Sequence, residues 1–330
     1  MSTSFHLIRE AAVKRVLGSA AVILLASSWT RVLAAQDPDI VCVPSVSGVN
    51  FETGAEWRVE APGGRCVQIR LSQLDMGLRQ AEIAINQYID RSIHDIERGH
   101  IDGYSQFRDW YRARQHQREK DEATADLLKN LFGTVLKTGL NYIFPESGVF
   151  MDKLREYASR TYELAANNVG TFTAGDVNQF LDRHQTVLNA QITNFISVRD
   201  AFQHDAQAVM DAAKWEFVLT NGTGTSVEIG PELRRMLRDA GIPEPGNETA
   251  RLYKERILIR QIRGVLASED CAYAGPCSNV FGPNLDAIAT STALRFLEPQ
   301  NFDRFCAAER GVNDLLRSAD CRDWRRTHGG

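Results

Sequence analysis

The chain has 330 residues, of which 43% are hydrophobic and 24% charged, and its formal net charge is −4. This length and composition are sufficient for a sizeable core, organised as one large domain or two smaller ones. An acidic chain lacks the basic face that nucleic-acid binding usually needs, so the sequence predicts no nucleic-acid partner.

The first 34 residues have the layout of an export signal. Lys14 and Arg15 precede a nearly uncharged stretch, 16–29. Val32-Leu33-Ala34 then supplies the small residues that a signal peptidase recognises at its cleavage site. This order predicts a cleaved secretory signal, residues 1–34, and a periplasmic or secreted protein. The alternative is an uncleaved anchor, but the stretch is shorter than the roughly 20 apolar residues that a bilayer span needs. Cleavage removes a net charge of +3 and leaves −7 on the mature chain.

Cysteines occur only after this signal. An even number of cysteines in an exported chain favours disulfides over metal binding or catalysis. No C-x-x-C pair is present, so the sequence predicts no metal site. The six disulfide candidates are Cys42, Cys66, Cys271, Cys277, Cys306 and Cys321. Fifteen pairings are open. Their clustering suggests a local scheme that joins Cys42 to Cys66, Cys271 to Cys277 and Cys306 to Cys321.

Residues 35–71 differ in composition from the rest of the chain. They are rich in valine and other β-favouring residues, and Pro62-Gly63-Gly64 provides a turn. The stretch from Cys66 to Leu71 alternates apolar and polar residues in the manner of a strand. We therefore predict a small β-rich segment of one or two hairpins, cross-linked by Cys42 and Cys66.

From Ser72 the apolar residues recur at steps of three or four, which predicts helices. Ser72 and Asp75 resemble an N-terminal capping pair. The pattern predicts one helix up to about Gly99 and a second from Gly103 to Phe144. It predicts a third over 147–168. A fourth helix of some forty residues follows a cap formed by Thr173 and Asp176.

The last third of the chain has shorter helical patterns. They predict helices near 231–240, 248–266, 284–297 and 301–318, with Cys271–Cys277 as a loop. Taken with the preceding elements, the expected fold is mainly α. We expect an elongated helical bundle over 72–222, a small β-rich N-terminal piece over 35–71, and a disulfide-stapled C-terminal helical piece within 223–330.

The segment 127–144 has the most distinctive helical pattern. One side is wide and apolar, while the other has polar residues and two lysines but no acid. Helices that lie in a membrane interface share this pattern, and so do helices that bury one face in a core. The candidate membrane or partner face consists of Leu127, Leu128, Leu131, Phe132, Val135, Leu136, Leu140, Ile143 and Phe144.

The only candidate catalytic residue is Glu146. Glu146-Ser147 resembles the Glu-Ser motif of lytic transglycosylases and goose-type lysozymes, and Ala166-Asn-Asn-Val-Gly170 fits that family's later Ala-x-Asn-x-Gly pattern. The resemblance covers at most a tenth of the chain. It implies that Glu146 is the general acid of a peptidoglycan-cleaving glycosidase. Alternatively, Glu146 follows Pro145 at a helix start, where the helix dipole favours an acid.

Two charged groups remain open to more than one interpretation. His94 and His100 belong to a mixed cluster, but residues six apart face different sides of a helix, so we expect a solvated helix end rather than a metal site. A later predicted helix has a row of basic residues. These could dock on an acidic partner or anionic lipid, or they could pair with an acidic face of another helix in the same bundle. These residues are Arg251, Lys254, Arg256, Arg260 and Arg263.

No motif assembles a nucleophile, an acid/base pair or a cofactor loop. The sequence therefore predicts a non-enzymatic protein without a cofactor, which acts through contacts with other envelope or target proteins or with a membrane surface. One alternative is a membrane-inserting, pore-forming-type toxin that uses 127–144. The other is the glycosidase centred on Glu146.

The export signal and the cysteine count predict the state of the mature protein. Its N-terminus should lie near Ala35 or Gln36, and its cysteines should all be oxidised. Terminal sequencing and thiol titration of the exported protein measure both properties. An intact Met1, or a reactive thiol in native protein, would contradict the prediction.

Overall fold

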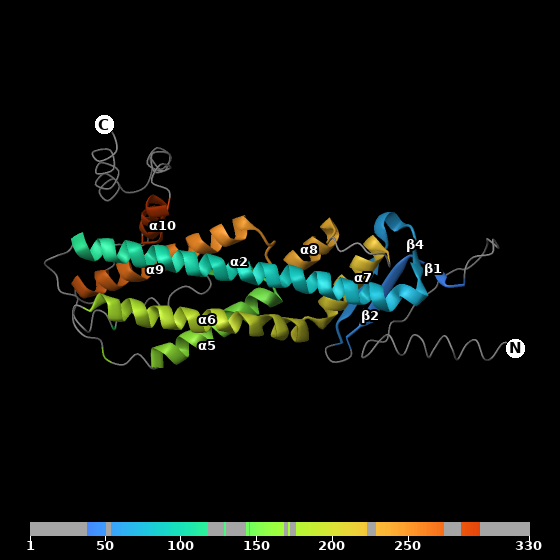
Figure 1. Ribbon diagram of the computed structural model, residues 1–330, viewed down its shortest axis with the longest axis horizontal. Helices are drawn as coiled ribbons and strands as arrows, with labels where there is room; N and C mark the ends of the chain where they lie inside the picture. The colour runs from blue at the N-terminus through green and yellow to red at the C-terminus, as the bar shows by residue number, and fades with distance from the viewer. Residues whose placement is uncertain are drawn as a thin grey trace, which may run out of the picture. The chain divides into compact units, whose positions relative to one another are not determined.

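A computed structural model describes residues 38–50, 54–117, 129, 143–144, 146–167, 171, 176–222, 229–273 and 285–297. The described chain is mainly helical with a small β-rich N-terminal piece, which confirms the predicted fold class (Figure 1). The predicted helix over 301–318 and the pairings of Cys277, Cys306 and Cys321 lie outside the described residues.

The chain forms two compact units from interleaved segments. Unit 1 comprises residues 1–95, 146–157 and 192–249, and unit 2 comprises residues 96–145, 158–191 and 250–330. Long helices therefore begin in one unit and end in the other. The predicted division of the sequence at residues 34, 71 and 222 stays a prediction.

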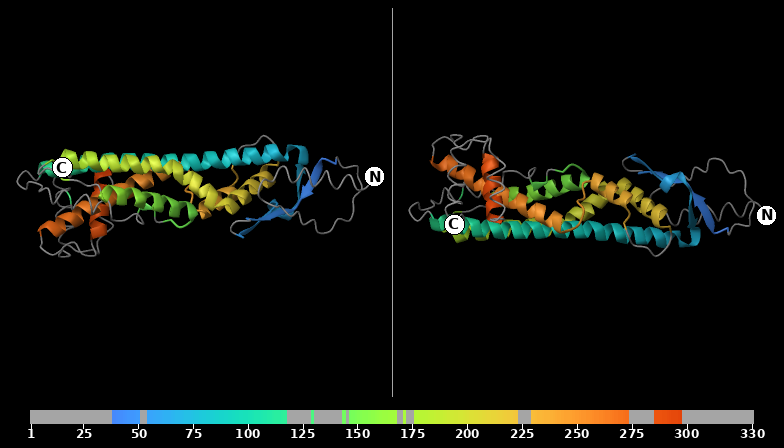
Figure 2. Two further views of the ribbon diagram at one scale, coloured as in Figure 1. Left: turned by 90° about the horizontal axis from the view of Figure 1, so that it is seen from below. Right: turned by 90° about the horizontal axis from the view of Figure 1, so that it is seen from above.

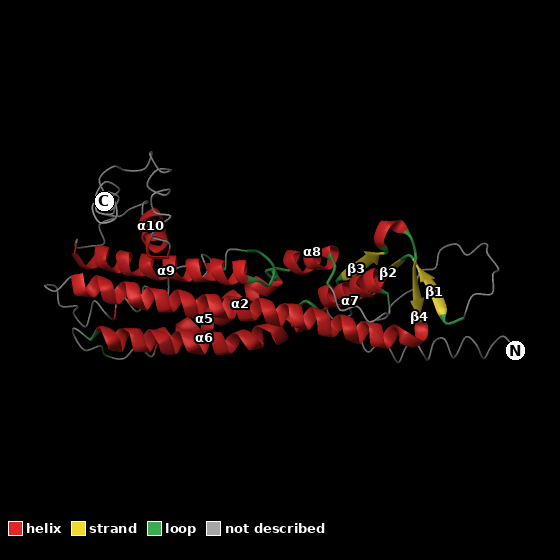
Figure 3. Cartoon of the chain, turned by 45° about the horizontal axis from the view of Figure 1, so that its top comes forward, coloured by secondary structure: helices red, strands yellow, loops and turns green. Residues whose placement is uncertain are grey.

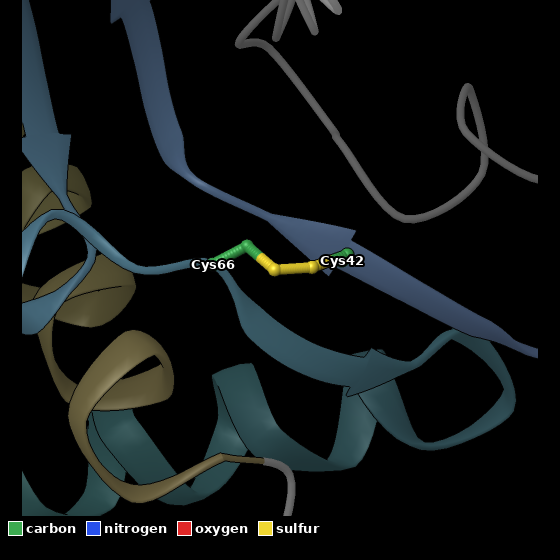
Figure 4. Close-up of a disulfide and its surroundings, with 2 residues drawn as sticks. All are labelled: Cys42 and Cys66. Carbon is green, nitrogen blue, oxygen red and sulfur yellow. A yellow bond between two sulfur atoms is a disulfide. The ribbon is translucent and has the colours of Figure 1, made fainter. Parts of the chain in front are cut away.

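The β-rich piece of unit 1 consists of two antiparallel pairs. In the first, β1 (Ile40–Val43) pairs with β4 (Val67–Arg70) and places Val41 opposite Ile69. In the second, β2 (Ser45–Val49) pairs with β3 (Glu56–Glu60). Cys42 and Cys66 form a disulfide with their Cα atoms 5.3 Å apart, a usual separation (Figure 4). One predicted hairpin, β2–β3, and the cross-link are confirmed, whereas β1 and β4 are not consecutive strands and their pair is not a hairpin.

A two-stranded pair is marginal alone and needs an apolar surface to pack on. Helix α7 (Gln207–Asn221) provides that surface in unit 1 and lies beside the strands (Figure 3). The shared core contains Val43, Val46, Trp57, Val59, Ile69, Ala212, Trp215, Val218 and Leu219. The alternating burial along β3 arises because successive strand side chains point to opposite faces.

Two long helices line up within unit 1 through polar contacts at their margins. Helix α2 (Leu74–Gln117) buries an apolar stripe that includes Ile85 and Ile89. Beside it runs α6 (Val177–Asp205), whose Arg199 donates to Asp90 Oδ1 at 3.0 Å (Figure 2). Such exposed ion pairs add little stability, so the buried stripe holds this pair of helices together.

Helix α5 (Val149–Asn167) begins in unit 1 at a close backbone contact. Gly148 has φ +126°, and a Cβ atom there would lie 2.6 Å from the carbonyl carbon of Ala240. That alanine follows α8 (Pro231–Asp239), and its carbonyl accepts a hydrogen bond from the Phe150 amide at 3.1 Å. Only glycine fits a contact of this kind. The predicted helices over 147–168 and 231–240 are both confirmed.

The predicted helix of some forty residues is in fact two helices, α6 and α7. At Ala206, φ is −109° and ψ is 28°, which is outside the helical region and marks the change of direction. No proline or glycine signals the break. Its structural role is to let α6 pack its Phe202 edge-on against Phe150 while α7 packs on the strands.

The predicted helix break at Gly99 and Gly103 is also wrong, because α2 continues through both residues. Within unit 2 they face α9 (Asn247–Tyr273). A Cβ on Gly99 would lie 2.6 Å from the Ala250 carbonyl oxygen, and one on Gly103 would lie 2.7 Å from the Lys254 carbonyl oxygen. The glycines therefore permit two helix backbones to approach closely, rather than ending a helix.

Helix ends follow the predicted caps in one case and depart from them in another. Asp176 accepts a hydrogen bond from the Gln179 amide at 2.9 Å and caps α6 as predicted. Ser72 does not cap α2. Its amide and hydroxyl donate instead to the carboxylate of Asp39 at 2.8 and 2.5 Å, because a 3-10 turn over Leu71–Gln73 precedes the helix.

The C-terminal elements match the pattern with one extension. Helix α10 (Leu285–Leu297) is confirmed, and α9 runs further than predicted, to Tyr273. Cys271 is therefore in the last turn of α9 and not in a loop. Among the described residues, no helix combines the length and apolarity that a membrane span requires.

The close crossing in unit 2 makes Gly103 sensitive to a single methyl group. Gly103→Ala should destabilise the protein by about 1–3 kcal/mol through overpacking, although alanine favours an exposed helix by up to about 1 kcal/mol. Asp102→Ala is the control, because Asp102 is exposed on the same turn. Chemical denaturation measures both variants. An unchanged or higher midpoint for Gly103→Ala would contradict the packing role.

Candidate functional site

The described end of the candidate face is buried in unit 2. Ile143 and Phe144 are fully buried, while Lys129 on the opposite side of the pattern is exposed. These positions favour a core face over a membrane face for the last two residues. The other candidates, Leu127, Leu128, Leu131, Phe132, Val135, Leu136 and Leu140, lie outside the described residues, and their role stays a prediction.

Aromatic and basic side chains hold Phe144 in place, and we call this set the Phe144 anchor. The Phe144 ring stacks on His100 with centroids 5.7 Å apart, and its centroid lies 5.8 Å from that of Tyr253. Arg256 donates to the Ile143 carbonyl at 3.3 Å, and its Cζ atom lies 5.3 Å from the Tyr253 ring centroid. Ring stacking and a charge-assisted hydrogen bond both favour this position.

His100 is a core residue, so the expectation of a solvated helix end is wrong at this position. Its side chain is fully buried, and Nδ1 lies 3.0 Å from the Ile96 carbonyl. Continuation of α2 and its close contact with α9 enclose the ring. Burial is the main cause that lowers the pKa of His100 to about 4; the carbonyl contact opposes the shift and the Arg260 charge adds to it.

A second buried imidazole belongs to His184 on α6. It is 2% exposed and lies among three aromatic rings, with centroid distances of 5.0 Å to Tyr104 and 6.0 Å to Phe107 and Phe180. Burial lowers its pKa to about 3, again with a contribution from Arg260. The Tyr104 hydroxyl donates to the Leu181 carbonyl at 2.6 Å, and burial raises the Tyr104 pKa.

Most basic residues of α9 are engaged within unit 2. Arg256 belongs to the Phe144 anchor, Arg260 is 1% exposed, and Arg263 forms an ion pair with Asp286 of α10. Arg251 pairs with Glu255 one turn along at 3.3 Å. These contacts favour the intrachain role over docking on an acidic partner or lipid.

The most deeply buried polar side chains of unit 2 were not predicted from the sequence. They are His100, His184, Gln191, Arg260 and Gln261, each 2% exposed or less. A partial signal exists for one of them, because Arg260 interrupts the apolar run from Ile257 to Ile262 and so lies on a buried helix. The histidines are surrounded by polar sequence and carry no comparable signal.

Glu146 lies three residues before α5 and is partly exposed. Its carbonyl accepts a hydrogen bond from Arg155 at 3.3 Å. The predicted placement at a helix start is therefore approximate. Within the described ranges, no three His, Cys, Asp or Glu side chains converge as metal ligands would. The side chains of His100 and His184 are enclosed by packing.

Comparisons with protein families, with curated proteins and with solved structures found no match for this chain.

Truncating the Phe144 ring should reveal how much the anchor contributes to stability. Phe144→Ala removes a fully buried aromatic side chain and should cost about 3–5 kcal/mol. Lys129→Ala, at an exposed position in the same predicted segment, should change stability by about 0.5 kcal/mol or less. Denaturant midpoints of the two variants decide the matter. Equal, small effects would place Phe144 outside the core in solution.

Proposed function

We propose that this chain is an exported, non-enzymatic protein that acts through helical surface contacts with other proteins in the cell envelope or outside the cell. Exposed apolar side chains near the start of α2 in unit 1 support this proposal most directly. Met76 is 45% exposed and Ile83 is 53% exposed, and Leu71 just before the helix is 44% exposed. We call Met76 and Ile83 the α2 apolar pair.

The α2 apolar pair has the geometry of a contact surface. Residues seven apart lie on one face of a helix, two turns along, so Met76 and Ile83 are displayed together. Ala81 and Ile85 on the same helix are fully buried, so the apolar stripe of the core is a separate face. Single exposed apolar residues are common, but aligned ones are typical of protein interfaces.

The surrounding charges favour a protein partner over a lipid surface. Arg79 lies between the two apolar residues and forms a 2.9 Å ion pair with Asp75. Glu82, beside Ile83, pairs with Lys214 of α7 at 3.6 Å. Helices that bind anionic membranes have a basic excess, which this face lacks. A balanced charge pattern around an apolar centre is typical of the rim of a protein interface.

The two alternative functions make different demands on the chain. A toxin that inserts 127–144 would have to withdraw Ile143 and Phe144 from their buried positions in unit 2. A glycosidase would need an acid/base partner for Glu146. Neither alternative draws support from the contacts of the described residues, so both rank below partner binding.

A site-specific crosslinking experiment tests the proposed contact. A photoreactive phenylalanine analogue at position 83 should form a discrete adduct in the producing cell. The same analogue at Arg98, on a later turn of α2, is the control. Met76→Ser should weaken the adduct at position 83. Adducts of equal strength at both positions would indicate random collisions, and flotation of the folded protein with liposomes at neutral pH would indicate a lipid surface instead.

Glu146→Gln separates partner binding from glycoside hydrolysis. The substitution removes a carboxyl group but keeps nearly the same shape. Because we assign Glu146 no catalytic role, the variant should retain both stability and crosslinking. A glycosidase without its general acid loses activity by orders of magnitude. If the purified protein clears cell walls and the folded variant does not, the glycosidase is the correct assignment.

A further inference from the structure

Unit 2 buries two imidazoles in the field of one buried cation. His100 on α2 is fully buried, His184 on α6 is 2% exposed, and Arg260 on α9 is 1% exposed. Three helices thus each contribute one nitrogen-rich side chain to the interior of one unit. Aromatic rings pack against both imidazoles, from Phe144 and Tyr253 at His100 and from Tyr104, Phe107 and Phe180 at His184.

We propose that unit 2 is an acid-opened module, whose packed state requires that the buried imidazoles of His100 and His184 both stay uncharged beside the Arg260 guanidinium. A protonated imidazole in this interior loses its hydration and meets a like charge. Water can reach a charged imidazole here only if α2, α6 and α9 separate. Protonation is therefore expected to open the unit.

Several groups around the two histidines are neutral or cationic. At His100 they include the Ile96 carbonyl, the Tyr253 ring and, over that ring, the Arg256 cation. At His184 the ring contacts include Tyr104, which stays neutral because burial raises its pKa. Around Tyr104 are two further cations, Arg108 and Arg112, against one carboxylate, Asp182.

The direction of the pH effect follows from proton linkage. Both histidines have lowered pKa values in the folded state, about 4 and about 3, so the unfolded state binds more protons below the usual histidine pKa near 6.5. Their stabilising contribution is therefore complete above that value and is lost as the pH falls. Between pH 7 and pH 5, each histidine should raise the unfolding equilibrium constant about 20-fold, and both together roughly 500-fold.

Unit 1 should respond differently over the same range. Its described histidines are exposed, with His204 at 79% side-chain exposure. Burial raises the pKa of two of its carboxyl groups, Asp211 and Glu216, and a folded state with raised carboxyl pKa values gains stability as the pH falls. Hydrogen bonds lower the pKa of three others, Asp39, Asp205 and Glu232, but their contribution is lost only as the pH falls through the usual carboxyl range of about 4, below pH 5. Mild acid is therefore expected to open unit 2 before unit 1.

Hydrogen exchange of the full chain, read by mass spectrometry at pH 7 and pH 5 and corrected for intrinsic rates, tests the proposal. Peptides from the part of α9 in unit 2 should lose protection in acid, while peptides from α7 in unit 1 should keep it. The variants are His100→Gln, His184→Gln and their combination. His94→Gln is the control, because His94 is exposed on α2.

The proposal predicts a different pH response for each variant. Each single variant should keep about a 20-fold change in opening between the two pH values, the double variant should lose most of it, and His94→Gln should behave as wild type. A double variant with the full pH response would overturn the proposal. If the double variant does not fold, imidazole NMR of the wild type decides: titration of both buried rings near the usual pKa in a still-folded unit 2 would overturn it equally.

Discussion

The interior of unit 2 depends on the close approach of α2 to α9. Gly99 and Gly103 lack the Cβ atoms that would meet the α9 backbone at 2.6 and 2.7 Å. This contact places His100, on the turn between the glycines, beside Tyr253 of α9. The stacked Phe144 ring then completes the shell. A larger residue at either glycine would separate the helices and expose the imidazole.

Close packing also explains why so many polar groups are inside unit 2. A long helix that runs through a core buries every residue on its inner face, whatever its polarity. Arg260 has Ile259 and Gln261 on either side and Ile257 one turn before, so its stem is drawn inward with the apolar stripe. Buried charges of this kind add little net stability, but they make the interior sensitive to any further charge.

Local pattern predicted the elements well, because helical and strand periodicities are local properties. The strands around Cys42 and Cys66 and the cap at Asp176 were all readable from the sequence. Tertiary packing decided the rest. Glycines that end a helix and glycines that admit a neighbour look alike in sequence, so Gly99 and Gly103 were misread. The bend at Ala206 has no local signal, and the burial of His100 depends on a helix some 150 residues later in the chain.

The contacts of the basic residues on α9 limit which surface the proposed protein partner could bind. Arg256, Arg260 and Arg263 are engaged inside unit 2 and the exposed Arg251 pairs with Glu255, so much of the positive charge of α9 is matched within the chain. On an acidic chain, this removes the most obvious electrostatic docking face. The proposed partner binding would then rely on apolar contact supported by paired charges, because desolvating an unpaired acidic surface is unfavourable. The start of α2, where Met76 and Ile83 are exposed beside the Arg79–Asp75 pair, meets that requirement.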